Sequence, residues 1–212
     1  MAVFEVRQCT NSGCGLRLPV DRETHCGNFC PKCGASMDCV ETIQDCLTSE
    51  SEIDTQSRDM VVLLDNIRSV QNVGSIFRTA DGAGIKHIYL CGITPTPADN
   101  PTIGKTALGS ERSVPWSSQL NAVELARQLI ADGYSLLVLE RTSEAVPIFQ
   151  YRDHEAAGHK PLALILGNER SGVDPGLIEL GEIVLALPMV GQKASLNVAV
   201  AFGVAVYWLA FT

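Results

Sequence analysis

The sequence of 212 residues lacks the features that mark several common classes of protein. Its first seventeen residues contain no apolar run of the kind found in a secretory signal peptide, so we expect a cytoplasmic protein. The most apolar stretch, residues 198–211, is shorter than the roughly 20 residues that a transmembrane helix requires. We therefore expect no association with a membrane.

Two nucleotide-binding signatures are also missing. Residues 104–106 read Gly-Lys-Thr, like the end of a phosphate-binding loop, but the first glycine of that motif would fall on Asp99. Residues 82–84 read Gly-Ala-Gly, but they end an expected helix instead of opening one. The third glycine of a dinucleotide-binding motif would moreover fall on His87. The chain thus carries neither phosphate-cradling motif.

Positive charge and large aromatic residues are scarce. The formal net charge is −8, which argues against indiscriminate binding of nucleic acid. The acidity is concentrated in residues 35–59, where seven acids face one base, and we interpret this stretch as a flexible linker. Residues 60–212 carry eleven bases and fourteen acids, so a local basic site remains compatible with the composition. Two Trp and four Tyr leave few rings for base stacking.

Eight cysteines in a chain without a secretory signal favour metal ligands or free thiols over disulfides. Two close pairs, each followed by glycine, can place four thiolates in the tetrahedron that Zn²⁺ prefers. The predicted ligands are Cys9, Cys14, Cys30 and Cys33. Cys26 and His25 are alternative ligands, whereas Cys39 and Cys46 are interpreted as incidental thiols. We predict a zinc-ribbon-like module over residues 1–34, in which the metal only stabilises the fold because so short a segment buries little surface.

From residue 60 onward, apolar strands alternate with helical patterns. The expected strands are residues 60–64, 87–91, 134–139, 162–166 and 183–187. The expected helices are residues 72–83, 120–131, 175–180 and 195–211, with long loops at 93–116 and 143–160. Continuous apolar strands separated by helices indicate an α/β fold with a parallel sheet that is covered on both faces.

The segment 185–198 passes from a strand through a turn into the last helix. A strand end that faces a helix N-terminus is where α/β proteins usually bind ligands. Ser195 and Asn197 are polar residues at the start of this otherwise apolar helix, although Ser195 could equally be its N-cap. We expect a helix that is apolar all round to pack against the sheet, a neighbouring subunit, or both.

Two further segments place polar residues at strand or helix ends. In residues 65–80, Asn72 is expected at a helix cap, and Arg78 follows about one and two-thirds turns later. A structural ion pair is the alternative role for Arg78. In residues 164–173, Gly167 follows a buried strand and Glu169 lies in a tight loop, where an exposed acid without function is the alternative.

Three motifs in order resemble the SpoU-type RNA 2′-O-methyltransferases of the SPOUT superfamily. They are N-x-G-x-x-x-R at residues 72–78, L-G-N-E-x-x-G at 166–172 and L-P-M-x-G-x-x-x-S-L-N-V at 187–198. The segment 105–116 also looks like that family, and the resemblance covers residues 60–212. It implies a C-terminal trefoil knot, bound S-adenosylmethionine (AdoMet), and a homodimer with the apolar last helix at its interface.

The resemblance also implies an activity and a role for each site residue. The reaction would be methyl transfer from AdoMet to a ribose 2′-hydroxyl of tRNA or rRNA. Because an arginine pKa lies above about 12, we prefer that Arg78 orients the hydroxyl and a phosphate instead of acting as a lasting base. The residues that position Arg78 and the substrate would be Asn72, Glu169, Ser195 and Asn197. The AdoMet contacts would be Leu166, Gly167, Leu187, Met189 and Leu196, and the phosphate contacts would be Arg68, Arg170 and Lys193.

Two other functions stay open at this point. One is a catalytically silent RNA-binding protein of the same fold, with the zinc module in recognition. The other is a methyltransferase that acts on proteins or small molecules.

Overall fold

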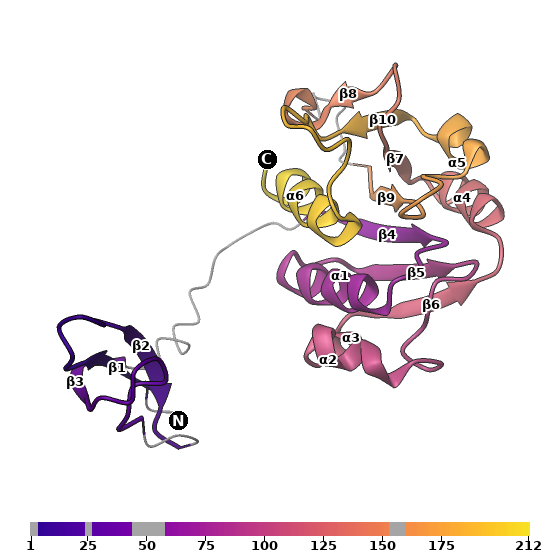
Figure 1. Cartoon of the computed structure of the whole chain (residues 1–212). Helices are drawn as coiled ribbons and strands as arrows, with labels where there is room; N and C mark the ends of the chain where they lie inside the picture. Colours follow the sequence, from indigo (N-terminus) through magenta and orange to yellow (C-terminus); the bar gives the residue numbers. More distant parts are fainter. Residues whose placement is uncertain (1–3, 24–26, 44–57, 153–159) are drawn as a thin grey trace. The chain divides into compact units, whose positions relative to one another are not determined.

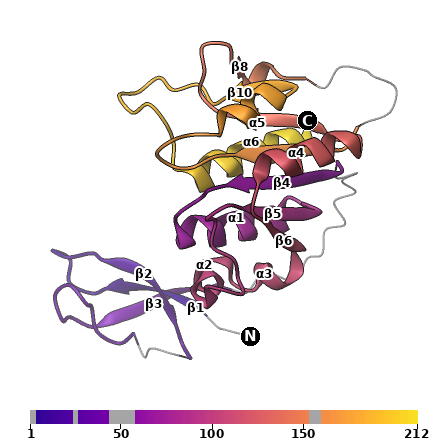
Figure 2. The same ribbon diagram turned by 90° about the vertical axis from the view of Figure 1, so that its right-hand side faces the viewer.

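The computed structural model describes residues 4–23, 27–43, 58–152 and 160–212. The chain divides into two compact units, Met1–Asp54 and Thr55–Thr212, shown in Figures 1 and 2. No helix in the described ranges combines the length and hydrophobicity that a bilayer span needs.

The smaller unit is built on a three-stranded antiparallel sheet of order β2-β1-β3. The strands are β1 (Phe4–Cys9), β2 (Arg17–Asp21) and β3 (Met37–Ile43). Two tight turns carry the cysteine pairs, one after β1 and one before β3. Among its described residues the buried apolar ones are few, namely Cys9, Val20, Cys30 and Met37, so this described part has almost no hydrophobic core.

The expected boundary of this unit at residue 34 is wrong. β3 pairs with β1 from Met37 to Ile43, so the module extends at least to Ile43 and the interpretation of residues 35–43 as linker fails. The reason is that β3 is exposed at every residue after Met37, and an exposed strand has the polar composition of a linker. His25, Cys26 and Cys46 lie outside the described residues.

The larger unit contains a seven-stranded sheet of order β6-β5-β4-β9-β7-β10-β8, and every strand pair in it is parallel. Its strands are β4 (Met60–Asp65), β5 (His87–Cys91), β6 (Trp116–Gln119), β7 (Ser135–Leu139), β8 (Val146–Pro147), β9 (Leu162–Leu166) and β10 (Ile183–Ala186). The predicted α/β fold with a parallel sheet is therefore confirmed.

Helices cover both faces of this sheet (Figure 1). The helices α1 (Val70–Gly82) and α6 (Val198–Phe211) pack side by side on one face, and α4 (Ala122–Ala131) and α5 (Pro175–Leu180) cover the other. Successive residues of β4 enter opposite cores: Met60, Val62 and Leu64 enter the first, and Val61 and Leu63 enter the second. A strand buried on both faces must be apolar throughout, which explains the continuous run in the sequence.

The two segments expected to be long loops contain short elements. Between β5 and β6 lie η1 (Pro101–Ile103), α2 (Gly104–Ala107) and α3 (Ser110–Ser113). Leu108 and Gly109 have left-handed backbone conformations and separate α2 from α3. After β8 lies η2 (Ile148–Gln150). Helices of three or four residues are too short to show a hydrophobic period, so the sequence pattern could not reveal them.

Two helix starts differ from expectation. The N-cap of α1 is Ser69, whose hydroxyl accepts from the Asn72 backbone N–H at 3.3 Å, so Asn72 lies inside the first turn. The N-cap of α6 is Asn197 instead of Ser195, and the helix begins at Val198. Both shifts turn an asparagine side chain toward a neighbouring element. After β10 the chain returns across the sheet to place α6 beside α1, and the trefoil knot implied by the resemblance stays a prediction.

Candidate functional site

A cavity of about 920 Å³, here called the main cavity, opens at the carboxyl ends of three adjacent strands. It is lined by Leu139, Leu166 and Leu185, which belong to β7, β9 and β10. The N-terminal ends of α1 and α6 form part of its wall. This is the edge at which parallel sheets with helices on both faces bind ligands.

The main cavity brings together most of the residues that the sequence singled out. Its lining includes Arg68, Asn72, Leu166, Gly167, Glu169, Arg170, Leu187, Met189, Ser195, Leu196 and Asn197. Lys193 and Arg78 do not line it. Three motifs that are far apart in the chain therefore meet at one place.

A chain of hydrogen bonds joins these motifs. Asn197 Oδ1 accepts from the backbone N–H groups of Ala199 and Val200, at 2.9 and 3.4 Å, and so caps α6. Asn197 Nδ2 then donates to Asn72 Oδ1 at 3.0 Å, and Asn72 Nδ2 donates to Glu169 Oε1 at 3.0 Å. The cap fixes which end of the Asn197 amide donates, and this determines the orientation of the Asn72 amide. Both ends of each amide thus have a hydrogen-bond partner.

Glu169 ends this chain as a carboxylate that accepts hydrogen bonds. It also accepts from the backbone N–H groups of Arg68 and Ser69, at 3.0 and 3.1 Å, just before the first turn of α1. Burial tends to raise the pKa of Glu169, but these N–H donors and Asn72 outweigh it and lower the pKa below 4.5. Glu169 therefore joins the loop after β9 to the start of α1, and its lowered pKa makes it a weaker base.

The loop after β9 is tightly built. A Cβ on Gly167 would lie 2.4 Å from the backbone of Val173, so only glycine allows these two segments to pass. Asn168 Oδ1 accepts from the backbone N–H groups of Arg170 and Ser171, and its Nδ2 donates to the carbonyl of Asn66. The glycine therefore serves the packing of the loop itself.

Two residues after β7 were missed by the sequence reasoning. Glu140 Oε2 accepts from the backbone N–H of Val173 at 2.9 Å, and Arg141 Nη1 donates to the carbonyl of Ala194 at 2.8 Å. Within the described ranges this is the one hydrogen bond that residues 188–196 make. Arg141 thus tethers the exposed segment that carries Met189 and Ser195. No sequence signal could have found it, because the contact spans 53 residues.

Arg78 lies outside the main cavity of its own chain. It is exposed on α1, about 9 Å along the helix axis from Asn72. No hydrogen bond or ion pair joins it to another described residue, so its alternative role as an ion-pair partner is not seen. One turn further on, a Cβ on Gly82 would lie 2.9 Å from Tyr207 Oη of α6. Arg78 therefore lies on the exposed face of α1, one turn before this contact with α6.

One side of α6 is exposed although it is apolar. Phe202, Ala205, Val206 and Leu209 are buried. Val200, Val204, Tyr207 and Phe211 are 54%, 37%, 46% and 47% exposed and follow one another at helical spacing. These four residues, here called the apolar stripe, form a surface of the kind that partner proteins cover.

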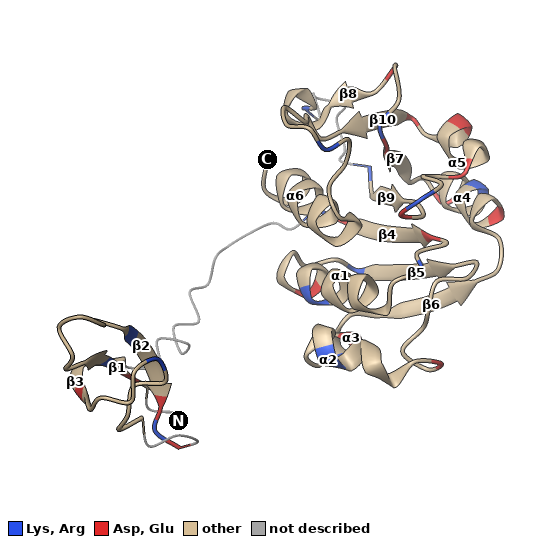
Figure 3. Cartoon of the chain, in the orientation of Figure 1, with Lys and Arg blue, Asp and Glu red and all other residues tan. Residues whose placement is uncertain are grey.

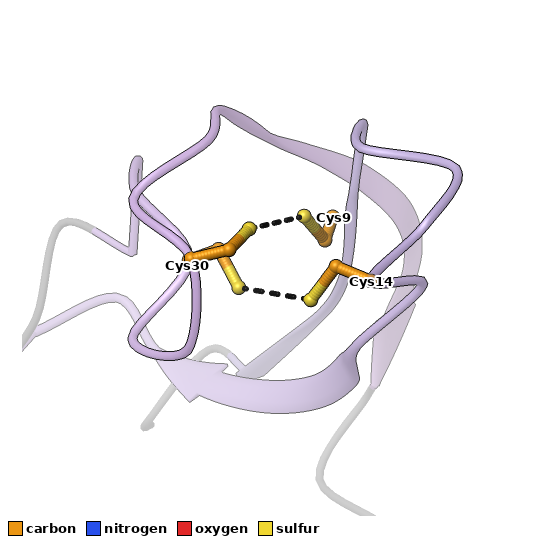
Figure 4. Close-up of side chains that lie close together, drawn as sticks. Cys9, Cys14 and Cys30 are labelled. Carbon is orange, nitrogen blue, oxygen red and sulfur yellow. Dashed lines mark hydrogen bonds between the residues drawn. The ribbon is translucent and has the colours of Figure 1, made fainter.

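The smaller unit contains a candidate metal centre. Figure 4 shows the side chains of Cys9, Cys14 and Cys30 directed toward a common centre, and Cys33 completes the group, with all four sulfurs within 4.8 Å of one another. The Sγ–Sγ distance is 3.4 Å between Cys9 and Cys33 and 3.8 Å between Cys14 and Cys30. Tetrahedral Zn–S bonds of about 2.3 Å require sulfurs about 3.8 Å apart. Burial and the neighbouring thiols raise the pKa of Cys9 to about 12. At Cys30, burial is outweighed by hydrogen bonds from the backbone N–H groups of Lys32 and Cys33, which lower the pKa to about 7.

Basic residues lie on several elements of the larger unit, as Figure 3 shows. Arg68 and Arg170 line the main cavity and are exposed, whereas Lys193 is exposed on the tethered segment. The positive charge near the main cavity thus comes from a few individual side chains.

Comparison with known proteins gives a consistent picture. The model of the SpoU rRNA Methylase family matches residues 59–207. The 23S rRNA (guanosine(2553)-2'-O)-methyltransferase RlmP of Bacillus subtilis is 31% identical over 199 residues, which are 91% of this chain and 76% of that protein. The tRNA (guanosine(18)-2'-O)-methyltransferase of Aquifex aeolicus is 28% identical over 156 residues, 73% of this chain and 70% of that protein.

Solved structures agree with these matches. The AdoMet bound rRNA methyltransferase from Sinorhizobium meliloti superposes with a TM-score of 0.64 at 29% identity, over 73% of this chain and 56% of that one. The Aquifex aeolicus TrmH/SpoU tRNA modifying enzyme gives a TM-score of 0.63 at 27% identity, over 73% of this chain and 75% of that one. The matched region contains all three motifs that meet at the main cavity. The chain therefore belongs to the SpoU rRNA methylase family.

Proposed function

We propose that this chain transfers the methyl group of AdoMet to a ribose 2′-hydroxyl of tRNA or rRNA. The observation that carries the proposal is the hydrogen-bonded chain from Glu169 through Asn72 to Asn197, which fixes three motifs around one cavity. The volume of that cavity, about 920 Å³, lies in the range of pockets that hold small ligands. AdoMet, when bound, supplies a methyl group activated by the sulfonium charge.

The lining of the main cavity fits this ligand. Leu166, Leu187 and Leu196 supply apolar surface for the adenine ring, and Met189 and Gly167 lie beside them. Ser195 adds a hydroxyl on the tethered segment. These residues would hold AdoMet, and the neighbouring arginines Arg68 and Arg170 would contact phosphates of the RNA together with Lys193.

Arg78 enters the mechanism through a homodimer. A second copy packed on the apolar stripe would cover four exposed apolar side chains and bring its own Arg78 toward this interface. There the guanidinium orients the ribose hydroxyl and a phosphate while it stays protonated. Arg78 would thereby hold the hydroxyl oxygen toward the methyl group that AdoMet supplies, and the hydroxyl would release its proton to solvent. The absence of Arg78 from its own cavity, together with its unpaired guanidinium in the described part of the chain, supports this arrangement.

We also propose that the four clustered cysteines bind a structural Zn²⁺. A shell of four thiolates leaves no open position for chemistry. The few buried residues of the smaller unit make its fold depend on this metal.

The proposal is tested by incubating the purified chain with methyl-labelled AdoMet and with tRNA and rRNA that lack modifications. We expect label in RNA, its loss in Arg78→Ala, and full retention in Arg127→Ala, which removes an exposed arginine from α4 on the other face of the sheet. Binding of both AdoMet and RNA without any transfer would instead support the catalytically silent protein. Transfer to proteins but not to RNA would support the third alternative.

A further inference from the structure

A second cavity, of about 380 Å³, lies outside the main cavity in the segment between β5 and β6. Its walls include Pro97 and Pro101, and Trp116 at the start of β6. The two cavities flank the same short turn, because Thr102 lines the first and the adjacent Pro101 lines the second. The two cavities are therefore neighbours at η1.

Trp116 is the tryptophan that remains available for stacking. The other one, Trp208, is already in contact with Phe149 at 5.2 Å between ring centroids, and the Arg152 guanidinium lies 4.8 Å from its ring centroid. Trp116 is partly buried against the core and lines the second cavity, where the proline rings are rigid. Such a slot loses little conformational entropy when it takes up a flat ring.

The polar groups of the second cavity match the edge and the phosphate of a nucleotide. The Glu111 side chain is only 12% exposed, and its Oε2 accepts from the backbone N–H of Gly109 at 3.0 Å. Glu111 Oε1 lies 3.4 Å from Arg112 Nε, and the Arg112 side chain is 87% exposed. The carboxylate can accept from N–H groups of a base, and the exposed guanidinium can reach a phosphate.

We propose that the second cavity binds an unpaired nucleobase of the RNA substrate, stacked on Trp116. Glu111 accepts hydrogen bonds from N–H groups on the edge of the base, and Arg112 contacts the phosphate. Sequence-specific RNA recognition mostly uses unstacked bases held against aromatic rings in this way. The inference rests on the proposed function insofar as RNA is the substrate. It explains how an acidic chain with few aromatic residues holds RNA.

The test is binding of a labelled single-stranded RNA of mixed sequence to the full chain and its variants. Because stacking on an aromatic side chain contributes about 1–3 kcal/mol per base, we expect Trp116→Ala to weaken binding about 5- to 150-fold. Trp116→Phe should lose less, and AdoMet affinity should stay unchanged in both. Arg112→Ala should reduce the slope of log Kd against log salt by about 0.7, whereas the control Arg127→Ala should not.

A second measurement does not depend on the folding of the Trp116 variants. In a Trp208→Phe chain, Trp116 is the sole tryptophan, since the sequence contains two. We expect single-stranded RNA to quench its fluorescence, with a smaller effect from duplex RNA. RNA that binds without quenching Trp116, or a Trp116→Ala chain that binds RNA as tightly as the original, would overturn the inference.

The two proposals fail in different ways. Quenching and weakened binding without any methyl transfer would sustain the base pocket and reject the proposed activity. Methyl transfer that is undiminished in Trp116→Ala would sustain the activity and reject the base pocket.

Discussion

Replacing Glu169 with Gln tests the hydrogen-bonded network by the smallest change of shape. The carboxylate accepts from three N–H donors, two on the backbone and one on Asn72. An amide has only one oxygen, and its best orientation keeps that oxygen for Ser69 and Asn72 and turns its NH₂ group against the N–H of Arg68. One hydrogen bond is then lost, and two change from a charged to a neutral acceptor.

The size of the effect follows from these contacts. Hydrogen bonds to a charged group contribute about 1.5–3 kcal/mol each and neutral ones about 0.5–1.5 kcal/mol. Glu169 is exposed, so water offsets part of the loss, and we expect a net cost of about 1–2 kcal/mol. If AdoMet binds only the ordered network, its Kd rises about 5- to 30-fold. Titration calorimetry with AdoMet measures this change directly.

A second substitution makes the test specific to the contact. Asn72→Asp alone places a second carboxylate beside Glu169, and the repulsion should weaken AdoMet binding strongly. In the Glu169→Gln chain the same substitution should cost less, because the new amide can donate to the aspartate. Equal costs in both backgrounds, or a Glu169→Gln chain that binds AdoMet normally, would refute the network.

Three further predictions concern the tether, the pH range and the metal. Arg141→Ala should raise the Kd for AdoMet about 2- to 12-fold, because one exposed hydrogen bond contributes about 0.5–1.5 kcal/mol. Arg141→Lys should restore part of the affinity, and the melting temperature should stay unchanged. An Arg141→Ala chain that binds AdoMet as tightly as the original would exclude the tether. Because the pKa of Glu169 is lowered in the folded chain, its contribution to the stability of the network is complete above about pH 4.5 and is lost as the pH falls through the lower folded pKa. AdoMet affinity should therefore fall with acid in the original chain but not in Glu169→Gln. Elemental analysis should find one zinc per chain, and Cys30→Ser should lose this zinc. Cys39→Ser should keep it, since the Cys39 thiol is exposed outside the cluster. Zinc retained by Cys30→Ser would contradict the four-cysteine site.

The sequence was most informative where burial constrains it on every side. Residues of β4 face two cores, so the strand had to be apolar at each position and was recognised directly. The three motifs could also be recognised in the sequence. Two of them contain a residue that the backbone requires: Gly167 allows close approach of Val173, and Asn197 caps α6.

The remaining features depend on contacts that local patterns do not encode. β3 is exposed and so has the composition of a linker. The last helix was expected to begin at Ser195, but its N-cap is Asn197. Both residue types are good N-caps, and the contact of Asn197 with Asn72 is what distinguishes them. Arg141 was invisible because its partner Ala194 lies on a segment without secondary structure.

The position of the transferred methyl group tests the central claim most directly. RNA methylated by the purified chain with labelled AdoMet should be digested to nucleosides and analysed by mass spectrometry. We predict that the label lies on the ribose, as 2′-O-methyl nucleosides, and that it is absent when Arg78 is replaced by Ala. Label on a base, or label on ribose that persists without Arg78, would contradict the account.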